Sequence, residues 1–414
     1  MATRLLVIAD SPTQSTGFGI VTENILTNLS AQDWDISVLA INYYGDAHPY
    51  QSKFKLFNPS AGGDVYGFAR LNEMLQGIQP ELIFIINDVW LVAEYIRRIR
   101  KVLPHVPIVV YTPVDSPCIK PDYVEPLNAA THVICYTDWG MQELRNSGLT
   151  VQGSVIPHGV NPGLFSPLPR PQARQELFLG VEALTDKDPF IVLYLGRNQP
   201  RKRVDLYVWI MAKWLKQFPH EDVYFHYHGA PKGDLGWDIE YLAHIWGVGD
   251  RLIVTSKTLR ADSGIPAEKM KYIYNAANVY LQVCANEGWS LPLHEAMACG
   301  VPCIVPEYSA LAEWPNGAVA YVPVDETPWM NPNNIDTMHR FINVQATVDM
   351  LERLYQDKAT RDDLGIAAHK HATQKKFLWK NIAAQFNQTY KNALRPQLQG
   401  MGEWQTISKK LAAK

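Results

Sequence analysis

The sequence has few of the features that mark secreted, membrane-spanning or zinc-binding proteins. Its 414 residues contain five cysteines, an odd number with no Cys-x-x-Cys pair, so neither a disulfide framework nor a zinc site is expected. No apolar run reaches the ~20 residues that a membrane span needs. The first residues lack the long apolar region of a secretory leader. We therefore expect a cytoplasmic protein without a transmembrane segment.

The net charge is also small. Lys and Arg total 38 and Asp and Glu total 41, which gives a formal charge of −3 and no general attraction to nucleic acid or anionic lipid. Residues 1–165 hold ten basic and fifteen acidic side chains. This balance argues against a DNA or membrane acceptor on that side, because such acceptors need cations against their phosphates. The basic residues of the remainder form short groups, such as the one at 197–203, which suit a small anionic ligand.

The chain is long enough for two α/β domains, and short apolar runs alternate in it with amphipathic stretches. This alternation predicts parallel sheets covered on both faces. Two such series occur, and a proline-rich connection at 157–190 separates them. The expected strands are 4–10, 36–41, 82–88, 108–115 and 131–137, then 190–196, 223–229, 251–256, 278–284 and 301–306. The expected helices are 19–30, 67–78, 90–101 and 138–147, then 203–217, 237–246, 266–276, 291–299, 344–356 and a tail from about 375 to 412.

The predicted fold class is therefore α/β, with two doubly wound, Rossmann-like domains that face a cleft. In each domain we expect the carboxyl ends of the strands, and the loops that follow them, to meet the ligand. The domains are expected to span residues 1–165 and 166–375, and a helical segment at 376–414 follows them.

The segment 286–306, NEGWSLPLHEAMACGVPCIVP, holds the strongest functional signal. Glu287 precedes a glycine, and Glu295 follows eight positions later in a stretch of helical character. Backbone N–H groups at the start of such a helix bind anions, and a diphosphate is the obvious guest. Each carboxylate can accept hydrogen bonds from sugar hydroxyls. The residues predicted to hold a nucleotide sugar here are Glu287, Gly288, Trp289, Ser290, Leu291 and Glu295.

The spacing of the two carboxylates, with EAMACG and VP after it, resembles the donor motif of retaining glycosyltransferases with the GT-B fold, of the group 1 or family 4 type. The resemblance covers nearly the whole chain and is strongest from about 155 to 315. It implies that Glu287 contacts the transferred sugar and Glu295 the nucleotide ribose, and that amides between them hold sugar and phosphate. It also implies that the first domain binds the acceptor, that the second binds the donor, and that the final helix crosses back to the first domain.

A second segment, LYLGRNQPRKRVDLYVWIMAKWL at 193–215, places a basic loop between a strand and a helix. A guanidinium group binds phosphate through two hydrogen bonds, and an ammonium group acts as a point charge. The resemblance implies that Arg197 and Lys202 neutralise the donor diphosphate and the charge of the leaving group. For Arg201 and Arg203, exposure to solvent is the expected role.

The first domain offers further candidates. Gly17 and Gly19 lie in a loop between a strand and a helix, where they either let the backbone approach a ligand or only satisfy the turn. Asp115 follows a strand, where it either binds a sugar hydroxyl or orients the acceptor, or simply starts a turn. His158, in the string PHGVNPGLF, is placed at the cleft by the resemblance, although a lone histidine is more often structural.

Two weaker matches and two acidic strings complete the candidates. Lys257 is expected near the nucleobase and Glu313 near the donor, with a surface position as the alternative for both. The Asp-x-Asp strings at 33–35 and 186–188 are a pattern that can place Mg²⁺ on a diphosphate, but both precede strands and are interpreted as solvated turns. No metal and no cofactor are expected, because basic residues take the place of a metal, as in the metal-independent family that the chain resembles.

The predicted activity is transfer of a sugar from a UDP- or GDP-sugar to an acceptor hydroxyl. The largest catalytic contribution is expected to be electrostatic stabilisation of the leaving phosphate. Retention of the anomeric configuration is implied by the resemblance, and no nucleophilic carboxylate is apparent. Glycosylation of a hydroxylated base in DNA, a nucleotide-sugar epimerase and a non-catalytic nucleotide-sugar-binding protein remain as alternatives, and the acceptor and the oligomeric state stay open. The predicted catalytic residues are Glu287, Arg197, Lys202 and Asp115.

The sequence also departs from the family pattern. Trp289 and His294 stand where the family has plainer residues. The segment 323–343, PVDETPWMNPNNIDTMHRFIN, is unlike the usual short link and is predicted to form a special loop.

Overall fold

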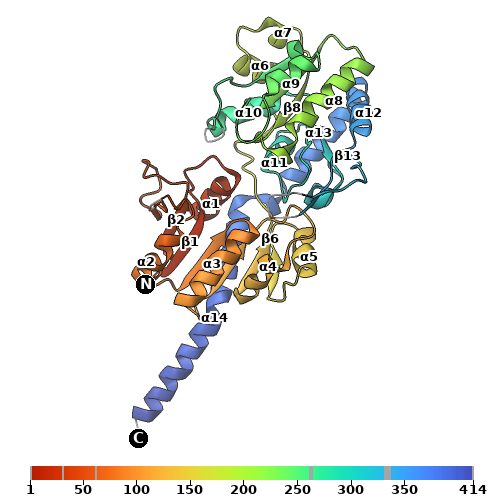
Figure 1. Ribbon diagram of the computed structural model, residues 1–414. Coiled ribbons are helices and arrows are strands. Elements are labelled where there is room, and N and C mark those ends of the chain that lie inside the picture. Colours follow the sequence, from red (N-terminus) through yellow and green to blue (C-terminus); the bar gives the residue numbers. More distant parts are fainter. Residues whose placement is uncertain (1, 30–31, 61–62, 261–263, 331–336, 413–414) are drawn as a thin grey trace. The chain divides into compact units, whose positions relative to one another are not determined.

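The computed structural model describes residues 2–29, 32–60, 63–260, 264–330 and 337–412 (Figure 1). Side chains are described as far as Arg395. Contacts divide the chain into two compact units. The first comprises residues 1–114, 119–158 and the chain from 379 onward, and the second comprises 115–118 and 159–378. The boundary between the two units therefore lies after His158, whereas the sequence predicted it after residue 165. The short segment Asp115–Cys118 belongs to the second unit.

A parallel sheet of seven strands forms the first unit, in the order β3-β2-β1-β4-β5-β6-β7. Strand β1 pairs with β2 on one side and β4 on the other, so the strand order changes direction between β1 and β4. Every residue of β4 is buried, which explains its uninterrupted apolar sequence. The strands are β1 (Thr3–Asp10), β2 (Trp34–Ile41), β3 (Lys55–Phe57), β4 (Leu82–Ile86), β5 (Ile108–Tyr111), β6 (His132–Cys135) and β7 (Gly153–Val155), and the helices α1 (Gly17–Thr27), α2 (Phe68–Ile78), α3 (Val89–Val102), α4 (Pro121–Val124) and α5 (Asp138–Asn146) connect them with the short helix η1 (Glu125–Ala129).

The long helix α14 (Trp379–Ala412, blue in Figure 1) belongs to the first unit. Phe386 packs against Phe84 and Tyr111, with ring centroids 5.4 and 4.8 Å apart. The Trp34 indole donates a 2.8 Å hydrogen bond to the Asn387 side chain. Burial of an aromatic side chain of this size stabilises the fold by about 2–3 kcal/mol, so these contacts secure the helix to the sheet.

The second unit repeats the doubly wound arrangement with a parallel sheet in the order β10-β9-β8-β11-β12-β13. Its strand order changes direction between β8 and β11. The strands are β8 (Phe190–Leu195), β9 (Val223–His228), β10 (Leu252–Val254), β11 (Val279–Leu281), β12 (Cys303–Pro306) and β13 (Ala320–Val322). The helices are α6 (Arg170–Leu177), α7 (Glu182–Thr185), α8 (Val204–Gln217), α9 (Ile239–Ile245), α10 (Ala267–Ala276), α11 (Leu291–Ala298), α12 (Val344–Gln356) and α13 (Lys358–Ala372), with the short helices η2 (Pro200–Lys202), η3 (Gly249–Arg251), η4 (Ser309–Ala312) and η5 (Lys375–Phe377).

The structure confirms the α/β class, the two doubly wound sheets and all ten expected strands. Strands β3, β7 and β13 were not expected, because three residues are too short for a periodic pattern. Helix α13 was not expected either, because its buried positions include Gly365, Ala368 and Ala372 instead of large apolar residues. The interpretation of Asp35 as a turn residue is wrong, because it lies within β2.

The unusual segment 323–343 contains a small antiparallel pair, β14 (Trp329–Met330) and β15 (Met338–His339). The residues that connect the two strands lie outside the described part of the chain. A separate antiparallel bridge joins Val324 and Ile342 at the base of this hairpin. None of the helices in the described part of the chain combines the length and the apolar character that crossing a membrane requires.

Candidate functional site

Two loops of the second unit follow neighbouring strands at the point where the strand order changes direction. In the parallel pair β8 and β11, Val192 lies opposite Val279 and Leu193 opposite Tyr280. The loop after β8 contains η2, and the loop after β11 leads into α11. Ligands of doubly wound folds bind outside the carboxyl ends of the strands at such a point. The two loops therefore define the candidate site.

The carboxylate of Glu287 lies where these loops meet. The ammonium group of Lys202 donates a hydrogen bond to its Oε1, and a guanidinium nitrogen of Arg201 lies 3.7 Å from its Oε2. The Gln282 amide donates a further bond of 3.3 Å to Oε1. The backbone N–H of Glu287 donates to Ser309 Oγ at 3.4 Å. Two cations thus share one carboxylate, and the cluster keeps one net positive charge.

The ionisation of Glu287 depends on these cations. Burial acts to raise the pKa of Glu287, but the charges of Lys202 and Arg201 and the hydrogen bond from Lys202 outweigh it, so the pKa lies below its ordinary value. The carboxylate is therefore ionised at neutral pH. Because desolvation offsets most of the attraction in a buried ion pair, such a pair contributes little to stability.

Helix α11 begins directly after this carboxylate. Ser290 is its N-cap residue, with a left-handed φ of 71°, and its hydroxyl accepts a 3.4 Å hydrogen bond from Leu293 N–H. Pro292 lies in the first turn, where its missing N–H is no loss. The start of a helix gathers N–H donors and the positive end of the helix dipole. Gly288, Ser290 and Leu291 therefore lie where an anion is favoured.

Glu295, one turn further along α11, has a different environment. The hydroxyl of Tyr274 on α10 donates a 2.6 Å hydrogen bond to Glu295 Oε2. Burial raises the pKa of Glu295 to about 7, and the bond from Tyr274 opposes that rise only in part. No ion pair joins Glu295 to another residue in the described part of the chain. Glu295 is therefore divided between its neutral and ionised forms near neutral pH.

Trp289, His294 and Trp314 form a buried cluster beside the loop, called the Trp289–His294 cluster below. The Trp289 ring stacks on Trp314, with centroids 4.4 Å and planes 14° apart. Its Nε1–H donates to His294 Nδ1 at 3.3 Å, and His294 Nε2–H donates to the carbonyl of Ala372 at 3.0 Å. Burial lowers the pKa of His294 to about 4, so the ring is neutral. Only the backbone of Trp289 can serve the predicted binding role, because its side chain packs inside the unit.

Arg197 and Lys202 pair with different carboxylates, although the sequence predicted that they act together on a diphosphate. Arg197 donates from Nε and Nη2 to the two oxygens of Asp234, at 2.9 and 2.6 Å. Its side chain is 53% exposed. Lys257 forms a more exposed ion pair, 2.8 Å from Glu240. Their predicted roles as donor ligands stay predictions.

Asp115 lies in the short segment Asp115–Cys118, which belongs to the second unit. Its Oδ1 accepts a 3.1 Å hydrogen bond from the hydroxyl of Ser116. The Asn286 amide, which is 1% exposed, donates to that same hydroxyl at 2.6 Å and to the carbonyl of Met338 at 3.0 Å. Asn286 also accepts a 3.4 Å bond from Arg340 N–H. One buried side chain beside Glu287 therefore joins the Asp115 segment and strand β15 to the candidate site.

The remaining candidates from the first domain lie in the first unit. Gly17 starts α1, and Gly19 N–H donates to the hydroxyl of the N-cap residue Thr16 at 3.0 Å. A Cβ at Gly19 would lie 2.3 Å from the carbonyl oxygen of Gln14, so close packing of the turn requires this glycine. His158 is 4% exposed, and its Nδ1 lies 2.8 Å from the hydroxyl of Tyr111. Turn geometry and core packing account for Gly19 and His158 without a ligand.

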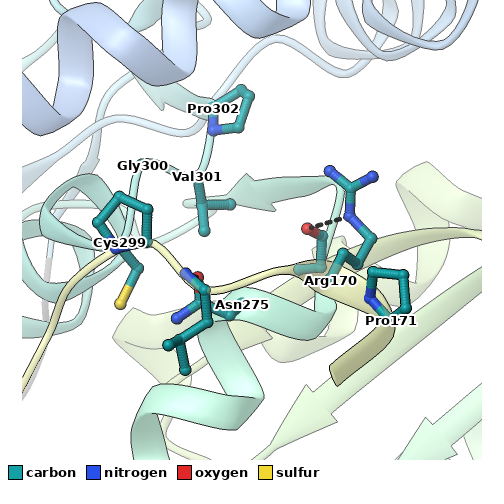
Figure 2. Close-up of a pocket in the computed structure, with 10 residues that line it drawn as sticks. Arg170, Pro171, Asn275, Cys299, Gly300, Val301 and Pro302 are labelled. Carbon is teal, nitrogen blue, oxygen red and sulfur yellow. Dashed lines mark hydrogen bonds between the residues drawn. The ribbon is translucent and has the colours of Figure 1, made fainter. Parts of the chain in front are cut away.

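Two features lie at other places in the second unit. Glu313 is the C-cap residue of η4 and is partly buried. A pocket of about 340 Å³ lies at the other end of α11. Arg170, labelled in Figure 2, lines this pocket and donates a 3.3 Å hydrogen bond to the carbonyl of Ala277. Neither Glu287 nor Glu295 lines this pocket. No group of three or more His, Cys, Asp or Glu side chains is placed to hold a metal among the residues that are described, and metal independence stays a prediction.

The fold matches solved structures over nearly its full length. Sucrose-phosphate synthase from Thermosynechococcus elongatus aligns with a TM-score of 0.75 and 21% identity, over 95% of this chain and 100% of that one. Anabaena HepE in complex with UDP aligns with a TM-score of 0.67 and 14% identity, over 95% and 100% of the two chains. These likenesses and the two doubly wound sheets define a GT-B fold, as the sequence predicted.

Part of the second unit is similar to known glycosyltransferases. Residues 189–331 match the family model described as Glycosyl transferases group 1. D-inositol 3-phosphate glycosyltransferase of Arthrobacter sp. (strain FB24) is 28% identical over 240 residues, which are 58% of this chain and 50% of that protein. O-antigen chain mannosyltransferase B of Escherichia coli is 28% identical over 200 residues, 48% of this chain and 45% of that protein. The chain spans about half the length of these curated relatives.

Several residues of the candidate site were not singled out from the sequence. Arg201 was expected in solvent, but it lies beside Glu287; its position next to Lys202 in the same short helix was the available signal. Asn286 directly precedes Glu287, but nothing in the sequence shows which backbone groups an amide will bind. Tyr274 and Gln282 come from other elements, so no local pattern connects them with the two glutamates.

Proposed function

We propose that this protein is a metal-independent glycosyltransferase that moves a sugar from a UDP- or GDP-sugar to an acceptor hydroxyl with retention of the anomeric configuration. The observation that carries the proposal is the shared ion pair of Glu287 with Lys202 and Arg201 at the start of α11. The cluster lies within the region that matches group 1 glycosyltransferases. It combines a net positive charge, a helix start and a carboxylate that can accept hydrogen bonds from sugar hydroxyls.

The chemistry follows from how charge moves during transfer. Breaking the anomeric C–O bond leaves the sugar cation-like and adds negative charge to the departing diphosphate. Lys202, Arg201 and the N–H groups at the start of α11 stabilise that growing charge, which is the largest contribution expected for such a reaction. When the diphosphate binds, it competes with Glu287 for the two cations. Glu287 is then released to accept hydrogen bonds from the sugar hydroxyls.

The second carboxylate serves recognition of the nucleotide. Glu295 accepts hydrogen bonds from the ribose hydroxyls in this proposal, and Tyr274 keeps its carboxyl group in one orientation. Asp115 orients the acceptor hydroxyl or binds the donated sugar. The departing phosphate removes the acceptor proton, so the reaction needs no nucleophilic carboxylate from the protein. Domain 1–165 supplies the remaining acceptor contacts.

The first test is a thermal shift of the purified protein against UDP, GDP, UDP-glucose, UDP-N-acetylglucosamine and GDP-mannose. A ligand that binds only the folded state raises the melting temperature. We expect one nucleotide family to raise it in the wild-type protein and Lys202→Met to abolish most of that shift. Lys358→Met is the matched control, because this exposed lysine pairs with Asp362 on α13. It should respond like the wild type.

The outcomes separate the proposal from its failure. A shift that persists fully in Lys202→Met would show that the nucleotide binds elsewhere. No shift with any of the five compounds at millimolar concentration would remove the donor site altogether. Binding without release of the nucleoside diphosphate, under any acceptor tried, would leave a non-catalytic binding protein.

A further inference from the structure

Strand β15 brings a buried histidine to the candidate site. His339 lies between the two residues whose backbone groups the Asn286 amide binds, so the strand is held beside the Glu287 loop on either side of it. The His339 side chain is buried, with 1% of the residue exposed. Its ring stands edge-on to Trp329 of β14, with 5.3 Å between the ring centroids.

Only one of the two ring nitrogens of His339 has a hydrogen-bond partner among the residues that the structure describes. Its Nε2 lies 3.3 Å from the hydroxyl of Thr337. Its Nδ1 is enclosed and has no hydrogen-bond partner among the residues that the structure describes. Leaving a buried polar atom unpaired is unfavourable, so such atoms in a folded protein need an explanation. Beside a candidate binding site, a polar group of the ligand is the direct explanation.

Burial is the main reason that the ring of His339 is neutral. Burial lowers the pKa of His339 most, the charge of Asp115 raises it, and Arg201 of η2 lowers it again, so the pKa lies below its ordinary value. From its own hairpin, Thr337 and Trp329 face the ring as uncharged groups. A neutral imidazole has one donor and one acceptor nitrogen. A hydroxyl group can pair with either of them.

We propose that His339 binds the sugar carried by the nucleotide donor, with Nδ1 hydrogen-bonded to one of the hydroxyl groups of that sugar. This rests on the proposed function, because it takes the donated sugar to lie against Glu287. Arg201 connects the two positions, since it contacts Glu287 and its charge acts on His339. Asp115 is partly exposed beside the imidazole and offers the same sugar a second acceptor. The hairpin thereby distinguishes sugars by the pattern of their hydroxyl groups.

Recognition requires the imidazole to turn toward the ligand, because Nδ1 is enclosed in this structure. The hydrogen bond that opposes the turn is the long one to Thr337. The backbone on either side stays fixed by Asn286. The ring can therefore change its orientation while β15 keeps its place.

The test compares the affinities of UDP and GDP with those of UDP-glucose, UDP-N-acetylglucosamine and GDP-mannose by isothermal titration calorimetry. His339→Asn keeps a polar atom near the position of Nδ1, His339→Gln keeps one near Nε2, and His339→Phe keeps neither. We expect His339→Gln and His339→Phe to bind the nucleotide sugar about tenfold more weakly, with an unchanged affinity for the nucleoside diphosphate. His339→Asn should retain most of the wild-type affinity. Met330→Ala, at a half-exposed position of the same hairpin, should bind both ligands like the wild type.

Each other outcome decides against the inference. If the wild type binds nucleotide sugars and the three His339 variants bind them equally well, His339 does not contact the sugar, and the proposed function stands. If donor affinity is unchanged but the acceptor KM rises in His339→Gln, the hydroxyl belongs to the acceptor. If the wild type binds none of the five probes, the proposed function fails and this inference with it. Should His339→Phe not fold, as judged by circular dichroism, His339→Asn and His339→Gln still give the comparison.

Discussion

The two glutamates of the Glu-x7-Glu segment differ in almost every physical respect. Glu287 is paired with two cations and has a lowered pKa, whereas Glu295 has a tyrosine hydroxyl as its partner and a pKa of about 7. They are eight positions apart on one loop and one helix. Their difference comes from other elements, because η2 supplies the cations and α10 supplies the tyrosine. The sequence motif therefore identifies the positions of the two glutamates, but the residues packed around each glutamate determine whether it is ionised.

Loss of the charge on Glu287 should have the largest effect. Glu287→Gln keeps the shape of the side chain but removes its negative charge and one of the two acceptor oxygens that face Lys202 and Arg201. We expect the rate of donor turnover to fall by roughly 100-fold or more, as when a group that stabilises the transition state is removed. The measurement is release of nucleoside diphosphate under saturating donor. Glu307→Gln, a surface change in the same unit, is the control, and equal rates in the two variants would contradict the account.

The next largest effect is expected on stability, from a substitution in the buried Trp289–His294 cluster. His294→Leu leaves the Trp289 indole N–H and the Ala372 carbonyl without their partner in a buried place. The free energy of unfolding should fall by about 2–3 kcal/mol. His369→Leu, which loses one partly buried bond to the carbonyl of Ala298, should lose about 1 kcal/mol. Urea titrations measure both free energies of unfolding. A larger loss of stability for His369→Leu would contradict the expectation that the Trp289–His294 cluster stabilises the fold more than the His369 hydrogen bond does.

The raised pKa of Glu295 predicts a pH dependence of stability. The folded chain holds this proton up to about pH 7, whereas the unfolded chain loses it near pH 4.5. The stabilisation from this group is therefore fully present at low pH and is lost as the pH rises through about 7. Relative to Glu295→Gln, the wild type should lose about 2 kcal/mol of stability between pH 5 and pH 8. Parallel urea titrations at four pH values check this, and a constant difference would show an ordinary pKa.

The smallest effect is expected at Arg197. Its ion pair with Asp234 involves a half-exposed guanidinium, and such pairs contribute at most about 1 kcal/mol. Arg197→Ala should therefore change the melting temperature little. In nucleotide binding it should lose less affinity than Lys202→Met does. A greater loss in Arg197→Ala would mean that Arg197 leaves Asp234 and binds the diphosphate more strongly than Lys202.

The sequence predicted the fold well because its strands are long apolar runs in regular alternation with helices. The sequence also identified Glu287, Glu295 and Lys202 as candidates, because these residues lie near a strand end or a helix start that a local pattern predicts. It did not identify the partners of these residues. Arg201 and Asn286 act through contacts between distant segments, which no local pattern specifies. His339 lies in the segment 323–343, for which the sequence predicted only a special loop and no binding role.

The most direct test of the central claim is release of the nucleoside diphosphate from the donor that binds in the thermal-shift panel. The assay follows wild type, Glu287→Gln and Lys202→Met with water, monosaccharides and polyols as acceptors. The account predicts measurable release by the wild type and release at least ~100-fold slower in both variants. Equal release by all three proteins, or none by a wild type that binds the donor, would contradict the claim that the Glu287 cluster performs sugar transfer.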